Sequence, residues 1–516
     1  MLGDERPRRF LAIVIASDSD AIQTKANEPT AGRIRFALIR DGRSIQRPES
    51  GSLRFARDDG RRLAQHDREL TMQTHFTAEQ LADPRIQPLE KILRSCVHCG
   101  FCTATCPTYL VTGDERESPR GRIYLIKDML ETGRAPTDDD VGPIDHCLSC
   151  LACVTTCPSG VDYRRLVDDA RVTIETRYRR PFADRLTRAV LARLLPSRRL
   201  FGAALRLAAV GRPFAPLLAR LPGLGPKLIA MLALAPKSPP RGARAGPGEF
   251  KAPIAATKPR RVALLTGCAQ DALAPQINAA TIRLLNRAGV DVVLPQGEGC
   301  CGSLLHHMGR EAPALDQARI NVDVWTREID GAGLDAILVT ASGCGATIKD
   351  YGYMLRGDAA YAGKAARVAA LAKDVSEFVV DLELAYSNPQ KLVVAYHAAC
   401  SLQHGQKIVE PPKTLLRRAG FEVRNPAEAH ICCGSAGTYN ILQPEMAGAL
   451  RARKVANIER LKPDVVAAGN IGCLQQIASG TATPVVHTME LLDWASGGPK
   501  PAALGSRGSF ANRQLS

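Results

Sequence analysis

The sequence lacks the long hydrophobic runs of a membrane-spanning protein. Its longest unbroken apolar stretch is Leu228–Ala235, whereas a spanning helix needs about 18 such residues or more. The opening residues, MLGDERPRRF, contain acids and no apolar core, so we expect no secretory signal there. These absences predict a cytoplasmic protein, in which sixteen cysteines stay reduced and serve as metal ligands rather than as disulfides.

A dinucleotide-binding fingerprint is missing as well. The only candidate glycines, Gly223 and Gly225, are followed by Pro226 and come after no predicted strand. We therefore expect no flavin or substrate site, and no catalytic residue, in this chain. A cofactor that handles electron pairs would belong to a partner.

Acidic residues are absent from one long segment. The net charge is +16, and residues 185–248 carry twelve Lys or Arg and no Asp or Glu. Because the rest of the chain is nearly balanced, we expect no nucleic-acid partner. The Leu/Ala-rich turns with spaced arginines are typical of helices that lie on an anionic membrane surface. The alternative is a helical hairpin that covers the neighbouring domain, with its arginines solvated or paired with acids.

Cysteine positions and composition divide the chain into six parts. The first part has no cysteine and is predicted to be a disordered extension, with a small accessory domain as the alternative. The Pro/Gly-rich stretch 236–253 predicts a linker without regular structure. The predicted parts are the extension 1–71, a ferredoxin-type domain 72–180, a basic helical segment and linker 181–258, α/β units 259–388 and 389–496, and a disordered tail 497–516.

The last two large parts repeat one pattern of apolar strand runs alternating with amphipathic helices. Cys268 and Cys300 are 32 residues apart, and so are Cys400 and Cys432. Alternating strands and helices favour parallel βαβ units. We predict an α+β/α/β multidomain chain, in which a helical two-cluster ferredoxin-like domain precedes two homologous α/β units related by pseudo-twofold symmetry.

Two cysteine runs have the pattern Cys-x2-Cys-x2-Cys-x3-Cys-Pro, starting at Cys96 and Cys147. In two-cluster ferredoxins the fourth cysteine of each run binds the other cluster. Structural zinc is disfavoured, because zinc sites usually use separated Cys-x2-Cys pairs. One predicted [4Fe–4S] cluster is held by Cys96, Cys99, Cys102 and Cys157, and the second by Cys147, Cys150, Cys153 and Cys106. Such clusters move single electrons, so we predict a relay subunit.

The remaining eight cysteines fall where predicted strands end. They are Cys268, Cys300, Cys301 and Cys344 in the first unit, and Cys400, Cys432, Cys433 and Cys473 in the second. The carboxyl ends of parallel strands meet at one edge of a sheet, so each set can converge on a metal or a further iron–sulfur cluster. The alternative is that they are small buried hydrophobic residues. We expect the nearby His306, His307, His397 and His430 to hydrogen-bond to cluster sulfur rather than to bind metal.

These motifs together resemble the iron–sulfur subunit of bacterial glycolate oxidase (glycolate dehydrogenase). The resemblance covers Met72 to Trp494 and includes both cysteine runs and both paired-cysteine units. The stretches 113–131 and 342–355 point most narrowly to that family. The paired-cysteine units alone are also similar to heterodisulfide reductase, lactate-utilisation and anaerobic glycerol-3-phosphate dehydrogenase proteins.

The resemblance implies a complex with FAD-containing subunits that oxidise glycolate to glyoxylate. This chain would pass the electrons toward a membrane acceptor such as quinone, from a peripheral position on the inner face of the cytoplasmic membrane. Alternatives are another 2-hydroxy acid or glycerol 3-phosphate as electron source, a thiol–disulfide reductase, or a non-catalytic metal-binding scaffold. One departure leaves the cluster type open: the wider family's motif ends in Cys-x2-Cys, whereas Cys344 and Cys473 have no such partner.

Overall fold

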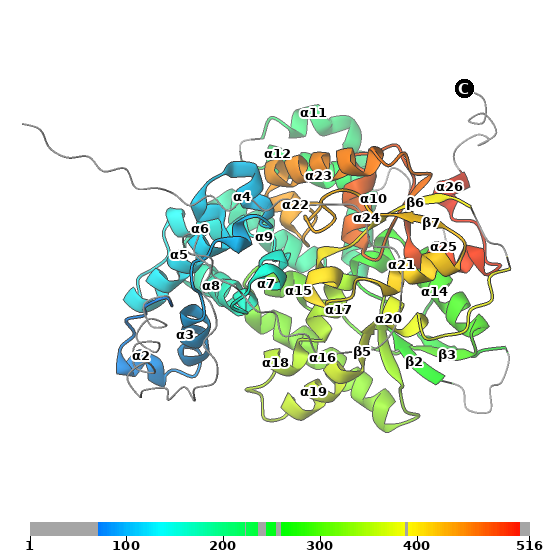
Figure 1. Cartoon of the computed structure of the whole chain (residues 1–516), viewed down its shortest axis with the longest axis horizontal. Helices are drawn as coiled ribbons and strands as arrows, with labels where there is room; N and C mark the ends of the chain where they lie inside the picture. Colours follow the sequence, from blue (N-terminus) through cyan, green and yellow to red (C-terminus); the bar gives the residue numbers. More distant parts are fainter. Residues whose placement is uncertain (1–70, 222, 236–243, 254–259, 388–390, 506–516) are drawn as a thin grey trace, which may run out of the picture. The chain divides into compact units, whose positions relative to one another are not determined.

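The computed structural model describes residues 71–221, 223–235, 244–253, 260–387 and 391–505 (Figure 1). Nearly all of the predicted N-terminal extension, and residues 506–516 of the predicted tail, lie outside the described residues. Within the described ranges no helix combines the length and apolar character needed to cross a membrane.

The ferredoxin-type region contains helices only among its described residues. Its apolar core holds fully buried side chains such as Leu93, Ile126 and Leu166. Proline ends each cysteine run: Pro107 opens helix α4, where its missing N–H costs nothing. The elements are α2 (Ala78–Ala82), α3 (Ile86–Arg94), η1 (Phe101–Thr103), α4 (Pro107–Thr112), η2 (Glu115–Glu117), α5 (Pro119–Thr132), α6 (Asp138–Asp145), α7 (Ala152–Thr156) and α8 (Tyr163–Arg177).

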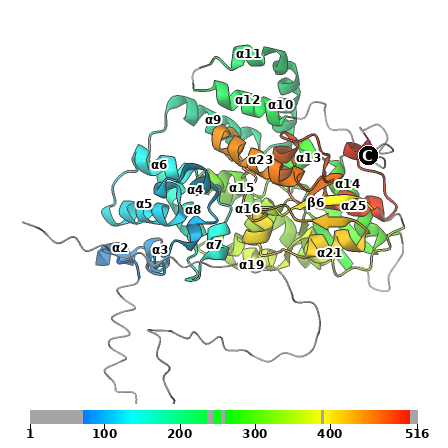
Figure 2. The same ribbon diagram turned by 45° about the horizontal axis from the view of Figure 1, so that its top comes forward.

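The basic segment forms a group of helices that lies over the paired-cysteine units. Helix α10 packs against α13, and α12 packs against α22 and α23 (Figure 2). Helix α9 contacts the ferredoxin-type region through an ion pair between Arg188 and Asp145. The alternative of a hairpin over the ferredoxin domain is therefore wrong for α10 and α12. The elements are α9 (Phe182–Leu194), α10 (Arg198–Gly211), η3 (Arg212–Phe214), α11 (Ala215–Leu218) and α12 (Gly225–Leu234).

The linker contains one strand that its composition did not predict. Strand β1 (Gly248–Phe250) pairs antiparallel with β3 (Val290–Leu294) at the edge of the first sheet. Glycine and nearby proline are tolerated there because an edge strand pairs on one side only. The expectation of no regular structure in 236–253 is thus wrong at these residues.

Two parallel sheets form the centre of the paired-cysteine units. The first has the order β1-β3-β2-β4-β5 and the second the order β7-β6-β8-β9. Apart from β1, all neighbouring strands are parallel, and the first sheet without β1 has the same order as the second. The predicted α/β units are confirmed. The remaining strands are β2 (Arg260–Leu264), β4 (Ala336–Val339), β5 (Ala372–Asp374), β6 (Val393–His397), β7 (Glu422–Arg424), β8 (Val465–Ala468) and β9 (Val485–His487).

Helices cover both sheets and join them. Strand residues of both sheets, among them Val262 and Val394, belong to one apolar core. Helix α14 packs on α25, and two of its arginines, Arg283 and Arg287, pair with the buried Asp493. The helices of these units are α13 (Ala269–Leu273), α14 (Gln276–Arg287), α15 (Ser303–His307), α16 (Glu311–Asp330), α17 (Ser342–Ile348), α18 (Tyr351–Met354), α19 (Ala362–Leu371), α20 (Val375–Val379), η4 (Ser401–Gly405), α21 (Pro411–Arg418), α22 (Tyr439–Leu442), α23 (Pro444–Glu459), α24 (Ile471–Ala478) and α25 (Thr488–Ala495).

The predicted tail begins with ordered structure. Helix α26 (Ala502–Gly505) follows α25, and its Leu504 is 1% exposed within the shared core. Burial of this one side chain attaches residues 497–505 to the second unit, which corrects the expectation of disorder from residue 497.

Candidate iron–sulfur sites

The first set of predicted cluster ligands lines one cavity. Cys96, Cys99 and Cys102 face it from the first run, and Cys157 faces it from the end of the second. Burial raises the pKa of Cys96 and raises that of Cys102 to about 11. Cys153 also borders this space. The four predicted thiols match the donor set of a [4Fe–4S] cluster, whose positive irons would favour the thiolate form.

A second cavity is lined by the other predicted set, Cys106, Cys147, Cys150 and Cys153. Cys106 comes from the first run and the other three come from the second. Burial raises the pKa values of Cys150 and Cys153 well above the ordinary range. The same donor chemistry therefore fits here, and the structure brings together both crossed sets.

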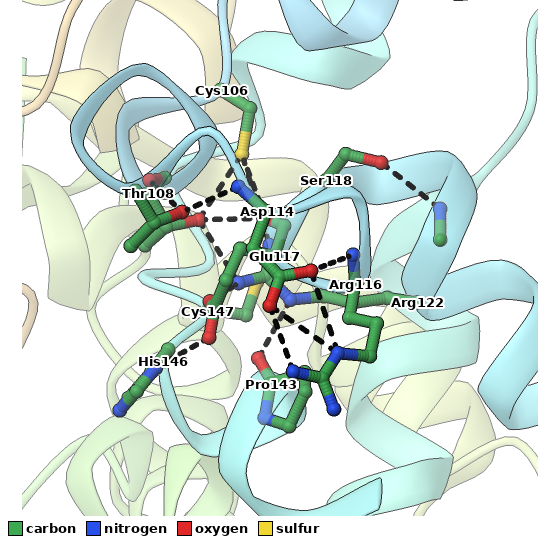
Figure 3. Close-up of polar contacts among 12 residues, drawn as sticks. Cys106, Thr108, Asp114, Arg116, Glu117, Ser118, Arg122, Pro143, His146 and Cys147 are labelled. Carbon is green, nitrogen blue, oxygen red and sulfur yellow. Dashed lines mark hydrogen bonds and ion pairs between the residues drawn. The ribbon is translucent and has the colours of Figure 1, made fainter. Parts of the chain in front are cut away.

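A buried ion pair lies beside this second cavity (Figure 3). Arg122, 1% exposed, donates to Glu117 Oε2 at 2.8 Å and to the carbonyl of Pro143 at 2.7 Å. Its Nη1 lies 3.7 Å from Cys106 Sγ. A fixed positive charge at this distance stabilises a thiolate. Glu117 and Arg122 both lie in the stretch 113–131. Charged residues near the start of a helix are usually exposed to solvent, so the sequence alone did not indicate that this pair is buried.

The first paired-cysteine unit also brings its four thiols together. Cys268 Sγ lies 3.5 Å from Cys300 Sγ. Cys301 raises the pKa of Cys300, and Cys344 raises that of Cys301, so all four thiols lie close enough to interact. Gly302 has φ +81°, and a Cβ there would lie 2.8 Å from the carbonyl oxygen of Ala314. The predicted convergence of thiols at the strand ends is therefore observed, and it requires this glycine.

The second unit repeats the arrangement. Cys400 Sγ lies 3.8 Å from Cys432 Sγ, and Cys433 connects Cys432 with Cys473. Gly434 has φ +88° and approaches the carbonyl of Ala447 as Gly302 approaches that of Ala314. The π-helical turn η4 starts directly after Cys400.

The histidines differ in their surroundings. His306 Nε2 lies 3.1 Å from Asp168 of α8, so it joins the first unit to the ferredoxin-type region. The carbonyl of His430 lies 3.0 Å from a ring nitrogen of His404. Among the described residues, one group of three metal-binding side chains has all its donor atoms within 4.8 Å of one another: His397, Cys433 and Cys473.

Three of the four thiol sets are contiguous. Cys153 lines both ferredoxin-type cavities. Cys150 and Cys432 belong to one apolar cluster, against which Cys400 packs. Tyr439 reinforces this contact by donating a hydrogen bond to the carbonyl of His146 at 3.0 Å. The ferredoxin-type region thus meets the second unit through its second cavity.

A larger cavity of about 440 Å³ lies between the two units and the basic segment. Its walls include apolar side chains of α9, α10 and α12, such as Leu191, Leu205 and Leu232. Its floor includes thiols of both units, namely Cys268, Cys301, Cys344, Cys400, Cys432 and Cys473. An apolar chamber bordered by both thiol sets was not predictable from the sequence.

The basic segment also exposes apolar side chains, on α10, η3 and α11. Leu207 is 72% exposed, and Val210, Phe214 and Leu217 are more than half exposed. Arg193, Arg199 and Arg206 are exposed in the same segment, and no ion pair of theirs occurs in the described part of the chain. Other basic residues of the segment are paired, for example Arg198 with Glu298 and Lys227 with Asp184.

Comparison with known families agrees with both kinds of site. A 4Fe-4S dicluster domain family matches residues 92–161, and a cysteine-rich domain family matches twice, at 262–349 and 394–478. The duplicated match corresponds to the two sheets described above.

Individual proteins are similar over most of the chain. The glycolate oxidase iron-sulfur subunit of Escherichia coli is 42% identical over 427 residues, covering 82% of this chain and 99% of that protein. The probable glycolate oxidase iron-sulfur subunit of Bacillus subtilis is 32% identical and covers 78% of this chain and 94% of that protein. Lactate utilization protein A of Geobacillus thermodenitrificans is 26% identical and covers 45% of this chain and 98% of that protein.

Proposed function

Because the chain belongs to the family of glycolate oxidase iron–sulfur subunits, we propose that it carries electrons from glycolate oxidation toward a quinone. Its place as an iron–sulfur electron-transfer subunit of an oxidoreductase, predicted from the cysteine runs, is confirmed by these relatives. The electrons come from an FAD-containing partner subunit. Oxidation of glycolate to glyoxylate releases two electrons and two protons, and reduction of one quinone to quinol consumes them.

The ferredoxin-type region holds two [4Fe–4S] clusters with crossed ligands in this proposal. Cys96, Cys99, Cys102 and Cys157 bind one, and Cys147, Cys150, Cys153 and Cys106 bind the other. Bound clusters of this type accept and donate one electron at a time. The chain's own part is to present deprotonated thiols, and Arg122 assists at Cys106 from 3.7 Å.

The paired-cysteine units hold the further iron–sulfur clusters. Their sheets share one strand order and one family match, which supports a pseudo-twofold relation between them. Each presents four buried or half-buried thiols at the same strand ends. The observation that best supports an electron relay is that three of the thiol sets adjoin one another. Cys153 borders both ferredoxin-type cavities, and Cys150 packs with Cys432 of the second unit.

The quinone head binds in the cavity of about 440 Å³. Leucine-rich helices supply apolar walls for a lipophilic ring and tail, and thiols of both units border the floor. A ring in this cavity would lie beside the last electron donors, and apolar walls are the usual lining of such ligand sites.

A peripheral membrane contact through α10 and α11 fits this path. Their exposed apolar side chains can enter the lipid interface, while Arg193, Arg199 and Arg206 attract an anionic leaflet. A quinone could then pass from the lipid through these helices' inner side into the cavity.

The test uses the whole complex purified with its flavin subunits. Glycolate added without oxygen should give the paramagnetic resonance signals of reduced iron–sulfur clusters, and a short-chain quinone should then abolish them. The chain alone should oxidise no glycolate with a dye acceptor. Glycolate oxidation by a preparation free of partner subunits, or clusters that glycolate leaves oxidised, would overturn the proposal.

A further inference from the structure

We propose that His397 is a ligand of the metal centre in the second paired-cysteine unit. That centre is then held by sulfur and one imidazole nitrogen, whereas the centre of the first unit is held by sulfur alone. The inference rests on the proposed function, which puts an iron–sulfur cluster in each unit.

The position of His397 favours coordination. It is the last residue of β6, three residues before Cys400. A ring nitrogen of His397 and the sulfurs of Cys433 and Cys473 all lie within 4.8 Å of one another. Such a spacing lets three donor atoms surround one metal ion, since Fe or Zn binds nitrogen and sulfur at about 2.0–2.3 Å.

Burial of the ring supplies the second argument. His397 is 1% exposed, and neither ring nitrogen has a hydrogen-bond partner among the described residues. One nitrogen of a neutral imidazole needs a donor and the other an acceptor. Leaving such groups buried and unpaired costs free energy, which coordination to a metal offsets at the free lone pair.

Comparison of the two units supplies the third argument. Leu265 stands three residues before Cys268, where the second unit has His397. Ala341 stands three residues before Cys344, whereas its counterpart Asn470 donates to Cys473 Sγ at 3.4 Å. The second unit therefore surrounds its thiols with polar groups that the first unit lacks.

A buried lysine strengthens this difference. Gly302 approaches Ala314 as Gly434 approaches Ala447, so these two alanines occupy equivalent positions in the two units. Seven residues after them stand Asn321 in the first unit and Lys454 in the second. Asn321 holds the carbonyl of Cys300, while Lys454, 1% exposed, holds the carbonyl of Glu428 before the second cysteine pair. A cation and a neutral imidazole reduce the negative charge of the second centre relative to the first.

The other nearby side chains are engaged elsewhere. Gln476, the third residue after Cys473, donates to the carbonyl of Ala447 and accepts from Asn440. His404 has Thr155 and the carbonyl of His430 as partners of its two nitrogens. His397 is thus the nitrogen donor that the geometry offers to this centre.

The decisive measurement is pulsed electron paramagnetic resonance on the reduced, unsubstituted complex. A directly coordinated ¹⁴N should give a strong hyperfine coupling that ¹⁵N-histidine labelling changes, whereas a hydrogen bond to sulfide gives only a weak one. His397→Cys should keep the iron content but lose this coupling and lower the reduction potential, because replacing imidazole by thiolate lowers cluster potentials. His404→Ala is the matched control and should keep the strong coupling.

A third variant distinguishes this inference from the proposed function. Cys433→Ser with Cys473→Ser should remove the second-unit iron and the nitrogen coupling together. An unchanged iron content in that double variant would overturn the second-unit cluster itself. If the double variant loses iron while the unsubstituted complex shows no strongly coupled nitrogen, the cluster stands and the role of His397 is overturned.

Discussion

At the scale of single residues, the sites depend on ionisable groups that the fold buries beside cysteine. Arg122 and Glu117 form an ion pair with side chains 1% and 9% exposed, and Glu117 also contacts His146 Nδ1 at 2.6 Å. Burying two charges costs free energy that their attraction only partly offsets, so the pair adds little net stability, while it places a positive charge 3.7 Å from Cys106.

Arg122→Met should destabilise the protein strongly. Removing one member of a buried pair leaves the Glu117 carboxylate without its cation, which costs about 3–5 kcal/mol. The measurement is the free energy or midpoint of unfolding followed by circular dichroism. Adding Glu117→Gln should recover part of the loss. Arg116→Met, which removes an exposed pair with Asp114, should have no measurable effect; equal losses in both single variants would contradict this assignment.

Crossed ligation makes a prediction about Cys106 and Cys157. Cys106→Ser should remove the cluster of Cys147, Cys150 and Cys153, because Cys106 lines their cavity. Cys157→Ser should instead remove the cluster of the first run. Mössbauer and paramagnetic resonance spectra of the two variants would show which signal disappears. Loss of the first-run signal in the Cys106 variant would mean that each run binds its own cluster.

At the scale of elements, helix α8 attaches the ferredoxin-type region to the first unit through several ion pairs, among them the following two. Arg165 makes a bidentate pair with Asp350, both bonds 2.6 Å long. Asp168 pairs with His306 of α15. Both partners on α8 lie on one helical face, three residues apart, so one helix aligns the two domains.

The His306–Asp168 contact should make stability depend on pH. Burial lowers the pKa of His306, but Asp168 outweighs it and the net pKa lies above 6.5. Burial raises the pKa of Asp168, but His306 and then His307 and Arg171 bring it below its usual 3.8. Asp350 also raises the pKa of His306, and Arg171 lowers it.

The sign follows from these directions. The raised His306 pKa contributes stability that is complete below pH about 6.5 and is lost as pH rises through the folded-state value. The lowered Asp168 pKa contributes stability present above about 3.8 and lost in acid. The unfolding midpoint of the unsubstituted protein should therefore exceed that of His306→Gln most between pH 4 and 6.5. An advantage that grows above pH 7 would contradict the pairing.

Elements and thiol sets were predictable where short-range spacing determines them. The spacing of cysteines within each run predicts which thiols face the same cluster. The equal spacing of cysteines after the predicted strands of the two units predicts that each set of thiols converges at one sheet edge. Strand β1, the Arg122 pair and the cavity under α10 and α12 depend on contacts between segments far apart in the chain. The lack of hydrogen-bond partners for the buried His397 ring likewise depends on residues far away in the sequence. From the sequence alone, a histidine shortly before a cysteine is more often a hydrogen-bonding residue than a metal ligand.

At the scale of the whole described structure, the basic segment has two sides with different roles. Its inner leucines line the cavity above both thiol sets, and its outer face exposes Leu207, Val210, Phe214 and Leu217. The sequence-based hypothesis of a membrane contact and the proposed quinone cavity therefore involve the same helices.

Vesicle co-sedimentation tests the outer face. Arg193, Arg199 and Arg206 changed together to Gln should weaken binding to anionic vesicles about a hundredfold, since each charge contributes about 1 kcal/mol near such a surface. The remaining binding should depend less on salt. A control with Arg356, Arg367 and Arg424 changed to Gln removes equal charge from other elements. Negligible binding by the unsubstituted protein, or equal weakening in the control, would exclude this membrane contact.

The shared apolar cluster of Cys150 and Cys432 also has a consequence for biosynthesis. Both side chains are less than a tenth exposed, and Leu148, Ile431 and Tyr439 close around them. Cys150 faces the second ferredoxin-type cavity and Cys432 borders the larger cavity of about 440 Å³, so the two thiols meet only when the ferredoxin-type region docks on the second unit. A chain whose ferredoxin-type region has not yet docked exposes these thiols and their apolar neighbours, so it stays open to the cell's iron–sulfur assembly proteins and to proteases.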